Sequence, residues 1–399
     1  MLQRSRFYLN SASFAYNFAL NMFVILVPLY VLSQGASPVI LGLIVSAQGL
    51  SQPLLRLFGG IFSDQFGERT ILRWSLGSLL LSAFIYFLSQ NVWAMVIAQL
   101  ITGASRSVFY SASQSYASRI DPARARVDLG VLAGYINVGN VAGSLAGGFL
   151  AQYTGYKIAF GIALCVAASA YLTILYLPEL PMRRKAKAVV SVVSVLRVRP
   201  LYLAGAAAFA AATPFVLMGS FYPSFYQHLG YEEWLISLLV AGNMLGLALA
   251  GFIFYFIQRL FSNRWLFFLG FAGTGLLIVI SPMFVHAFVQ SLILFIMGVT
   301  SGLANMFYQF VSTEYSAPEE RGVAMSVSGF FWAIANLCVP ATFGLLVSIA
   351  GLAESFWISG GVFLAMGFLT PMLFLWLMPR DSSFAGKNRP GKLTAGNIP

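Results

Sequence analysis

A single arginine, Arg106, lies in the middle of a long apolar stretch of this 399-residue chain. It is thirteen residues from both Trp93 and Arg119, which corresponds to about 20 Å along a helix in either direction. An arginine this deep costs at least about 2.5 to 3.5 kcal/mol, so it should face water, a partner or a ligand. All twelve acidic residues fall near predicted helix ends or in loops. The guanidinium could therefore bind an anionic ligand group, or donate to carbonyls and amides of the protein.

Polar and aromatic residues recur at helical spacing in several apolar segments, which places them on one face of each predicted helix. The segment with Arg106 also carries Gln99 and Tyr110, and the first segment carries Asn17 and Asn21. Such faces could line a ligand site, but amides also bond from helix to helix, for about 0.6 kcal/mol each. The candidate substrate-binding residues are Asn17, Asn21, Gln99, Arg106, Tyr110, Tyr222, Asn305, Gln309 and Trp332. Further amides lie in neighbouring segments, at Gln48, Gln52, Asn140, Asn243 and Asn336.

The composition is that of an integral membrane protein. Hydrophobic residues make up 59% of the chain and charged residues 9%, with a mean hydropathy of +0.82, whereas soluble domains carry about a quarter charged residues. The two cysteines and two histidines have no metal-binding or redox spacing. Because no acid pair and no nucleophile–base set stands out in the apolar segments, we expect no enzyme activity, metal or cofactor.

The apolar segments predict twelve membrane-spanning helices, with both termini in the cytoplasm. In this layout the inner segments hold 20 lysines and arginines, and the outer segments hold one, Lys157. Such a bias sets orientation, and it explains the net charge of +11 by topology and contact with anionic membrane lipid, not by nucleic acid. The helices are expected at about residues 7–33, 38–63, 70–89, 91–118, 128–153, 156–178, 200–228, 232–259, 264–283, 286–315, 322–350 and 353–378.

A charged stretch, Gly59 to Arg73, separates the second and third apolar segments and predicts a short turn outside the hydrocarbon. Its spacing, Gly60-x-x-x-Asp64-x-x-Gly67-x-Arg69, resembles the loop signature of the major facilitator superfamily. Gly67 suits a turn position with positive φ. Glu68 departs from the pattern, because the family usually has a basic residue there, and this puts the usual charge network of the loop in question. The residues expected to act in conformational gating are Gly60, Asp64, Gly67, Arg69 and Arg56.

This resemblance covers nearly the whole chain and implies an all-α fold of two pseudo-symmetric six-helix bundles. The bundles would comprise residues 1–178 and 200–379, joined by a basic cytoplasmic linker at 179–199 and followed by a disordered cytoplasmic tail at 380–399. The substrate site would lie between the bundles, lined by the first, fourth, seventh and tenth helices, and the bundles would rock between two states. Asp64 would then meet the start of the eleventh helix when the inner side is closed.

The implied function is secondary active transport of a small organic molecule by a monomer. The chain lacks the nucleotide-binding pattern Gly-x-x-x-x-Gly-Lys-Ser, so an ion gradient is the expected energy source, with H+ as a candidate coupling ion. Many family members of this size are exporters of drugs and metabolites, which makes export the first prediction. The alternative is uptake of an organic anion with Arg106 as its counter-charge, and the remote alternatives are a membrane-embedded enzyme and a non-transporting sensor.

Overall fold

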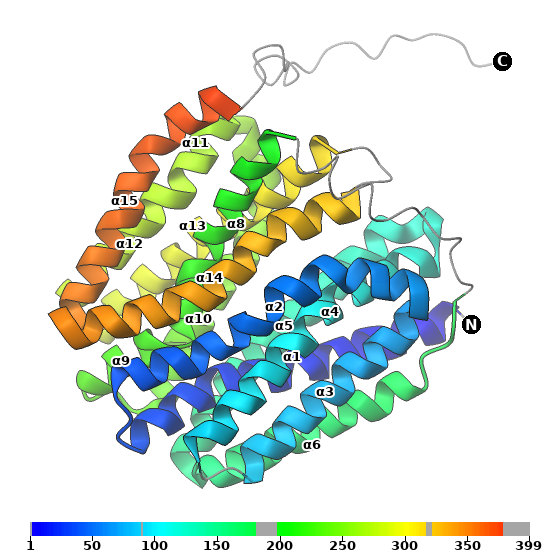
Figure 1. The fold of residues 1–399 in the computed structure, drawn as a ribbon, viewed down its shortest axis with the longest axis horizontal. Helices are drawn as coiled ribbons and strands as arrows, with labels where there is room; N and C mark the ends of the chain where they lie inside the picture. The colour runs from blue at the N-terminus through cyan, green and yellow to red at the C-terminus, as the bar shows by residue number, and fades with distance from the viewer. Residues whose placement is uncertain (1, 89–90, 181–197, 317–320, 378–399) are drawn as a thin grey trace.

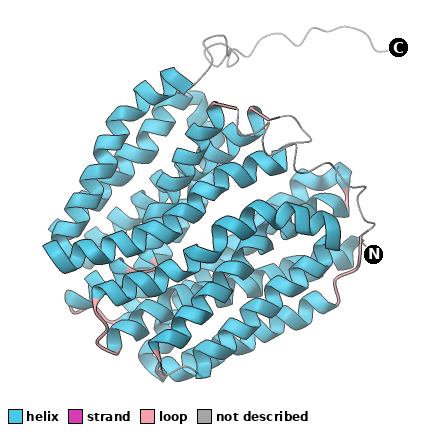
Figure 2. Ribbon diagram, viewed as in Figure 1, coloured by secondary structure: helices cyan, strands magenta, loops and turns pink. Residues whose placement is uncertain are grey.

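The computed structural model describes residues 2–88, 91–180, 198–316 and 321–377, and every regular element in these ranges is helical (Figure 1, Figure 2). Eleven helical spans in the described ranges are long and apolar enough to cross a membrane, and two of these spans consist of more than one element. The 29-residue apolar helix α2 (Pro38–Phe66) lies between the first two of these spans, so the structure, with eleven to twelve apolar helices, agrees with the predicted all-α fold. Most of the expected linker at 179–199 and all of the expected tail at 380–399 lie outside the described residues.

The first half of the chain forms six long helices joined by short turns. Gly67 and Gly155 make two of these turns with φ values of +78° and +82°, a region that favours glycine because other residues clash there. The positive φ expected at Gly67 is thus confirmed. The elements are α1 (Leu2–Ser33), α2 (Pro38–Phe66), α3 (Glu68–Leu88), α4 (Val92–Ile120), the short η1 (Pro122–Arg124), α5 (Ala125–Thr154) and α6 (Tyr156–Leu175).

The second half repeats this plan with two interruptions. Its elements are α8 (Pro200–Met218), α9 (Phe221–His228), α10 (Glu233–Leu260), α11 (Asn263–Phe268), η2 (Leu269–Gly273), α12 (Thr274–Ile280), η3 (Ser281–Met283), α13 (Ala287–Glu314), α14 (Arg321–Ala350) and α15 (Leu352–Leu377). The sequence predicts continuous helices over 200–228 and 264–283, and both predictions are wrong in this respect. The first breaks at Ser220, where φ is −146° and ψ is −78°. The second contains the π-helical turn η2, where Gly270 packs so closely on Ala304 of α13 that an added Cβ would lie 2.9 Å from its methyl group.

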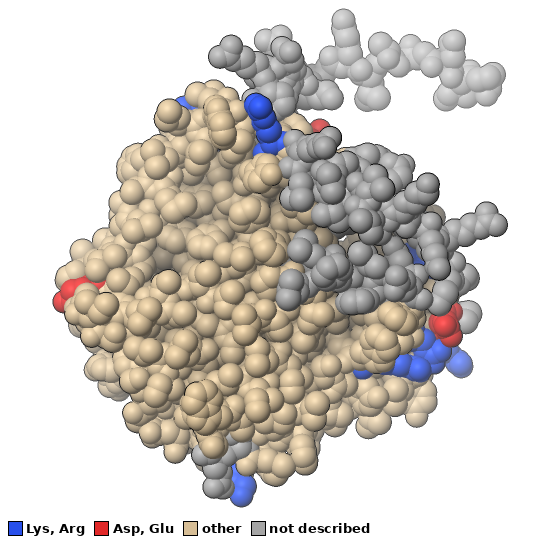
Figure 3. Space-filling model, viewed as in Figure 1, with Lys and Arg blue, Asp and Glu red and all other residues tan. Residues whose placement is uncertain are grey.

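The two ends of the helix bundle differ in their turns. We call the end with Leu2, the α2–α3 turn and the α10–α11 turn the basic end, and the end with the α1–α2 and α5–α6 turns the opposite end. On the face drawn in Figure 3, the described charged side chains lie at the rim, and a wide surface between them carries none. Large apolar side chains such as Phe84, Val138 and Phe252 are exposed on the helices. This surface suits contact with lipid tails.

Two pairs of helices join the halves by close backbone contact. α2 packs along α14, as Figure 1 shows, and α5 packs along α10. A Cβ added at Gly49 of α2 would lie only 2.2 Å from the backbone nitrogen of Leu337, and one at Gly148 of α5 would lie 2.4 Å from the carbonyl oxygen of Glu233. Small residues let backbones approach this closely. Both contacts lie toward the opposite end, where the halves are packed together.

Candidate functional site

Arg106 lies on α4 at the junction between the two halves and is 9% exposed. Its Cζ lies 4.8 Å from the centroid of the Phe215 ring on α8, within the range of a cation–π contact. Its Nη1 is buried and has no hydrogen-bond partner among the described residues. The ion pairs between described residues involve other arginines near the basic end. Arg106 therefore lies far from both ends of its helix and has no anionic partner among the described residues. Both features are predicted from the sequence.

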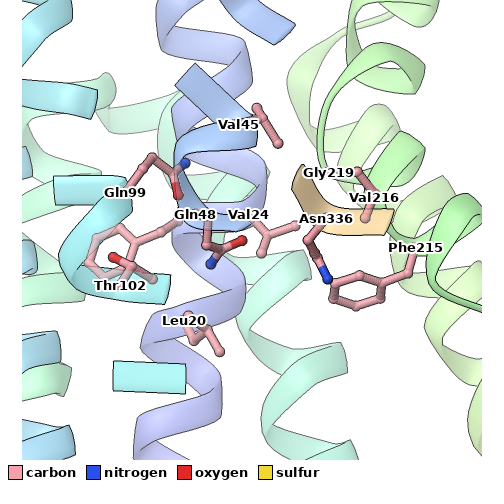
Figure 4. Close-up of a pocket in the computed structure, with 11 residues that line it drawn as sticks. Leu20, Val24, Val45, Gln48, Gln99, Thr102, Phe215, Val216, Gly219 and Asn336 are labelled. Carbon is pink, nitrogen blue, oxygen red and sulfur yellow. The ribbon is translucent and has the colours of Figure 1, made fainter. Parts of the chain in front are cut away.

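A small cavity lies next to this contact, between the two halves (Figure 4). Its volume of about 20 Å³ leaves room for about a single water molecule. Figure 4 shows Gln99 and Thr102 of α4 on one side and Phe215 and Asn336 on the other. The lining residues are Leu20, Phe23, Val24, Val45, Gln48, Gln99, Thr102, Phe215, Val216, Gly219 and Asn336. Amide groups and apolar side chains thus share one interior surface.

Arg106 belongs to this surface although it does not line the cavity itself. Gln99, Thr102 and Arg106 recur at helical spacing on α4, and Arg106 lies one turn beyond Thr102. Phe215 links the two, because its ring contacts the guanidinium and also lines the cavity. On its other side, Phe215 packs against Trp332 of α14, with ring centroids 5.9 Å apart. A row of side chains therefore runs from α4 through α8 to α14.

The predicted residues on α1 form bonds within the first half. The Tyr110 hydroxyl donates to Oδ1 of Asn17 at 2.8 Å, and Nδ2 of Asn21 donates to Oδ1 of Asn140 at 2.6 Å. Nδ2 of Asn17 donates to the carbonyl oxygen of Ser13 at 2.8 Å. Two of these bonds join helices, as the alternative interpretation of the amides expects, while Oδ1 of Asn21 is buried without a partner among the described residues.

The predicted residues of the second half lie in three different environments. Tyr222 is fully buried inside that half, with its hydroxyl 3.8 Å from Sδ of Met297 and its ring packed on Phe356. The break at Ser220 explains this position, because helical spacing does not continue from α8 into α9. Asn305 and Gln309 of α13 are half-buried and do not line the cavity of Figure 4. Trp332 reaches the site through Phe215.

Phe215, which contacts Arg106, is not among the residues predicted from the sequence. It lies next to Pro214 in an alanine-rich helix and four residues before Gly219. Phenylalanine is common in this chain, with 36 copies, so no feature of the sequence distinguishes this one. Gln48 and Asn336 are noted in the sequence only as amides of neighbouring segments, and the structure brings both to the cavity.

The turn between α2 and α3 has a charge network that includes the unusual Glu68. Glu68 is 5% exposed at the start of α3, where its carboxylate accepts from Arg119 and, at 2.8 Å, from the Ser115 hydroxyl. Arg69 pairs with Glu179 at 3.5 Å and also donates to the carbonyl oxygen of Leu175 at 3.4 Å. The side chains of the other expected gating residues lie outside the described part of the structure, and their roles stay predictions. These residues are Arg56, Gly60 and Asp64.

Comparison with known proteins places this architecture in a family. The model of the Major Facilitator Superfamily matches residues 9–236 and 204–397, and the chain belongs to this superfamily. It is a multi-pass membrane transporter and not an enzyme.

Relatives of known sequence match over part of the chain. The Quinolone resistance protein NorA of Staphylococcus aureus is 28% identical over 126 residues, which are 31% of this chain and 32% of that protein. The uncharacterized MFS-type transporter YceJ of Bacillus subtilis is 25% identical over 127 residues, again 31% of this chain and 32% of that protein. The chain thus matches about a third of the length of these relatives.

Solved structures match over nearly the whole chain. A point mutant of the nucleoside transporter NupG has a TM-score of 0.78 at 12% identity, covering 93% of this chain and 100% of that one. A bacterial homologue of the human lysosomal transporter Spinster, inward-facing and unoccupied, has a TM-score of 0.76 at 15% identity, covering 95% and 99%. At this identity the likeness concerns the fold.

Proposed function

We propose that the protein exports a small amphiphilic organic molecule across the cell membrane by alternating access. The observation that carries this proposal is the position of Arg106, a buried guanidinium with an unpartnered Nη1, beside a cavity between the two halves. Transporters of this architecture bind substrate at such an interface. The partial similarity to NorA, whose name states quinolone resistance, supports export of an organic compound.

The chemistry of the site suits an amphiphilic substrate. Leu20, Val24 and Val216 present apolar surface, while Gln48 and Gln99 present amides. An apolar body would bury its surface against the first group, and polar substituents would bond to the second. The guanidinium of Arg106 would bind the strongest acceptor of the substrate, because charge-assisted hydrogen bonds are about twice as strong as neutral ones.

We propose an ion gradient as the energy source, with H+ as the coupling ion. At the opposite end, a carboxylate oxygen of Glu233 accepts from the Tyr156 hydroxyl, and the backbone nitrogen of Glu233 donates to Gln152 at 3.0 Å. These bonds join α5 and α6 of the first half to α10 of the second. Both bonds must break when this end opens.

A second candidate function is uptake of an organic anion. Arg106 favours it, because no carboxylate among the described residues neutralises this guanidinium. Transport into oriented vesicles separates the two candidates, since export and uptake load opposite compartments. The same vesicles with an imposed pH gradient test the coupling ion.

The decisive experiment replaces Arg106, either with lysine, which keeps the charge but lacks the two-pronged guanidinium, or with glutamine, which removes the charge. The full-length protein and its Arg106→Gln, Arg106→Lys and Arg264→Gln variants would be tested against quinolones, cationic dyes and aromatic carboxylates. We expect Arg106→Gln to abolish binding and transport of the recognised compound, and Arg106→Lys to weaken binding at least about tenfold, because lysine lacks the planar fork. Arg264 is exposed at the basic end and serves as the control for a lost positive charge.

Melting temperatures of the same samples separate a binding role from a structural one. If Arg106 only stabilises the fold, both substitutions should lower the melting temperature, and the folded fraction should bind normally. Normal affinity in a stable Arg106→Gln protein would reject Arg106 as a substrate contact. If no member of the panel is bound or transported by the wild-type protein, the proposed function itself is wrong.

A further inference from the structure

The contact with Phe215 stabilises the charge of the Arg106 guanidinium but does not supply the hydrogen bonds that its N–H groups require. The Phe215 ring lies against Arg106 with 4.8 Å between its centroid and Cζ. A ring can stabilise the cation, but it offers no lone pair to the N–H donors, and Nη1 is left without an acceptor among the described residues. A charged donor that is buried without an acceptor costs free energy. A ligand that supplies an acceptor would therefore bind Arg106 more favourably than the Phe215 ring does.

The neighbouring polar groups of the first half are already bonded to one another. The Tyr16 hydroxyl lies 2.9 Å from Oγ of Ser105, and Ser105 in turn bonds to the carbonyl oxygen of Ser75 at 2.7 Å. Tyr110 donates to Asn17 at 2.8 Å. Nη1 bonds to none of these groups, so it is open to an acceptor that a ligand would supply. A guanidinium fork fits a carboxylate by two parallel hydrogen bonds.

Phe215 also occupies the space that such a ligand needs. The adjoining cavity has a volume of about 20 Å³, which is room for about a single water molecule. Arg106 belongs to the first half and Phe215 to the second. The ring covers the face of the guanidinium that it contacts, so a ligand on that face requires the ring to move away. The volume that becomes free is that of an aromatic ring.

We infer that Phe215 is an internal competitor of the substrate, and that the substrate is an organic monocarboxylate with a ring-sized apolar body. Its carboxylate would bind the fork of Arg106, and its ring would fill the space left by Phe215. A single carboxylate matches the one cation that the described residues place at this contact. This inference rests on the proposed function, because it gives a chemical class to the molecule transported at the same site.

The test uses 2-naphthoate as the probe, with the neutral 2-naphthamide as its match in shape. We expect the full-length wild-type protein to bind naphthoate at least about tenfold more tightly than the amide. Phe215→Leu should tighten naphthoate binding about 2- to 30-fold, the range that corresponds to loss of a competing cation–π contact. Phe215→Trp should weaken it, because a larger ring binds the cation better and fills more space.

Phe209→Leu is the matched control on the same helix. Phe209 packs against Phe363 inside the second half, so this substitution should leave naphthoate affinity unchanged. Weaker naphthoate binding in Phe215→Leu would overturn the inference, since it would make Phe215 a contact of the substrate. Equal binding of naphthoate and naphthamide, or no naphthoate binding by either the wild-type protein or Phe215→Leu, would overturn it as well. If the protein then transports a panel compound that is not a carboxylate, the proposed function is supported and only this inference is wrong.

Discussion

Glu68 lies at the centre of the charge network at the turn between α2 and α3. It begins α3, where a carboxylate interacts favourably with the positive end of the helix dipole. Arg119 and Ser115 of α4 both donate to it, so the carboxylate joins α3 to α4 at the basic end. The charge network of this turn is therefore built around an acidic residue.

We expect Glu68→Gln to lower the free energy of unfolding by about 2 to 3 kcal/mol. Removing one partner of a buried ion pair costs about 3 to 5 kcal/mol, and the partial exposure of Arg119 reduces this figure. Glu68→Lys should cost more, because it places like charges together. Thermal unfolding in detergent measures both, with Glu314→Gln at an exposed position as the control. Additive losses in a Glu68→Gln, Arg119→Gln double variant would contradict the pairing.

For single residues, the sequence predicts where charged side chains lie better than it predicts which side chains they contact. The depth of Arg106 and its lack of an acidic partner follow from counting residues along apolar segments. Phe215 could not be predicted, because its role depends on which helix of the second half faces α4. The bonds between Tyr110 and Asn17 also depend on tertiary packing, so spacing alone could not decide between a ligand and a neighbour.

At the level of helices, the contact between α2 and α14 bears most directly on conformational change. The backbone at Gly49 contacts the backbone at Leu337, where no flexible side chain can move aside. We expect Gly49→Ala to disfavour the packed arrangement of the opposite end by about 1 to 3 kcal/mol, the usual cost of overpacking. Gly134→Ala on α5 is the matched control, because its added methyl group would meet nothing within 4 Å.

Spin labels at Gln34 and Ser348 would report this change. Both residues are exposed near the opposite end, one in each half. In a background with Cys165 and Cys338 replaced by alanine, the label distances in Gly49→Ala should shift toward longer values. The Gly134→Ala protein should keep the distances of the parent. Identical distance distributions in the two variants would show that this contact does not govern opening.

The extent of each helix is predictable because apolar runs must match the thickness of the membrane. The interruptions in the second half are not predictable in the same way. Ser220 and η2 lie inside apolar sequence, and the close approach of α13 at Gly270 is a tertiary contact. Because the helix breaks at Ser220, the side chain of Tyr222 points into the core of its own half. Residue spacing along a continuous helix could not predict this direction.

For the whole molecule, the sequence predicts two halves from the family resemblance, but not how they meet. That arrangement depends on glycines such as Gly49 and Gly148, which carry no periodic signal of their own. The distribution of charge is a stronger signal, because basic residues gather in alternate turns of the chain. Such a bias predicts the orientation of the chain in the membrane.

The last prediction concerns this orientation, with the basic end in the cytoplasm. In the background without Cys165 and Cys338, Gln34→Cys would mark the opposite end and Ser262→Cys the basic end, since both positions are exposed in turns. An impermeant thiol reagent added to intact cells should label the first and spare the second, and disrupted cells should be labelled at both. Lysines and arginines at the basic end would then face anionic lipid headgroups of the inner leaflet, where each is worth about 1 kcal/mol. Labelling of Ser262→Cys alone in intact cells would invert the topology and reverse the direction of transport expected for every vesicle experiment.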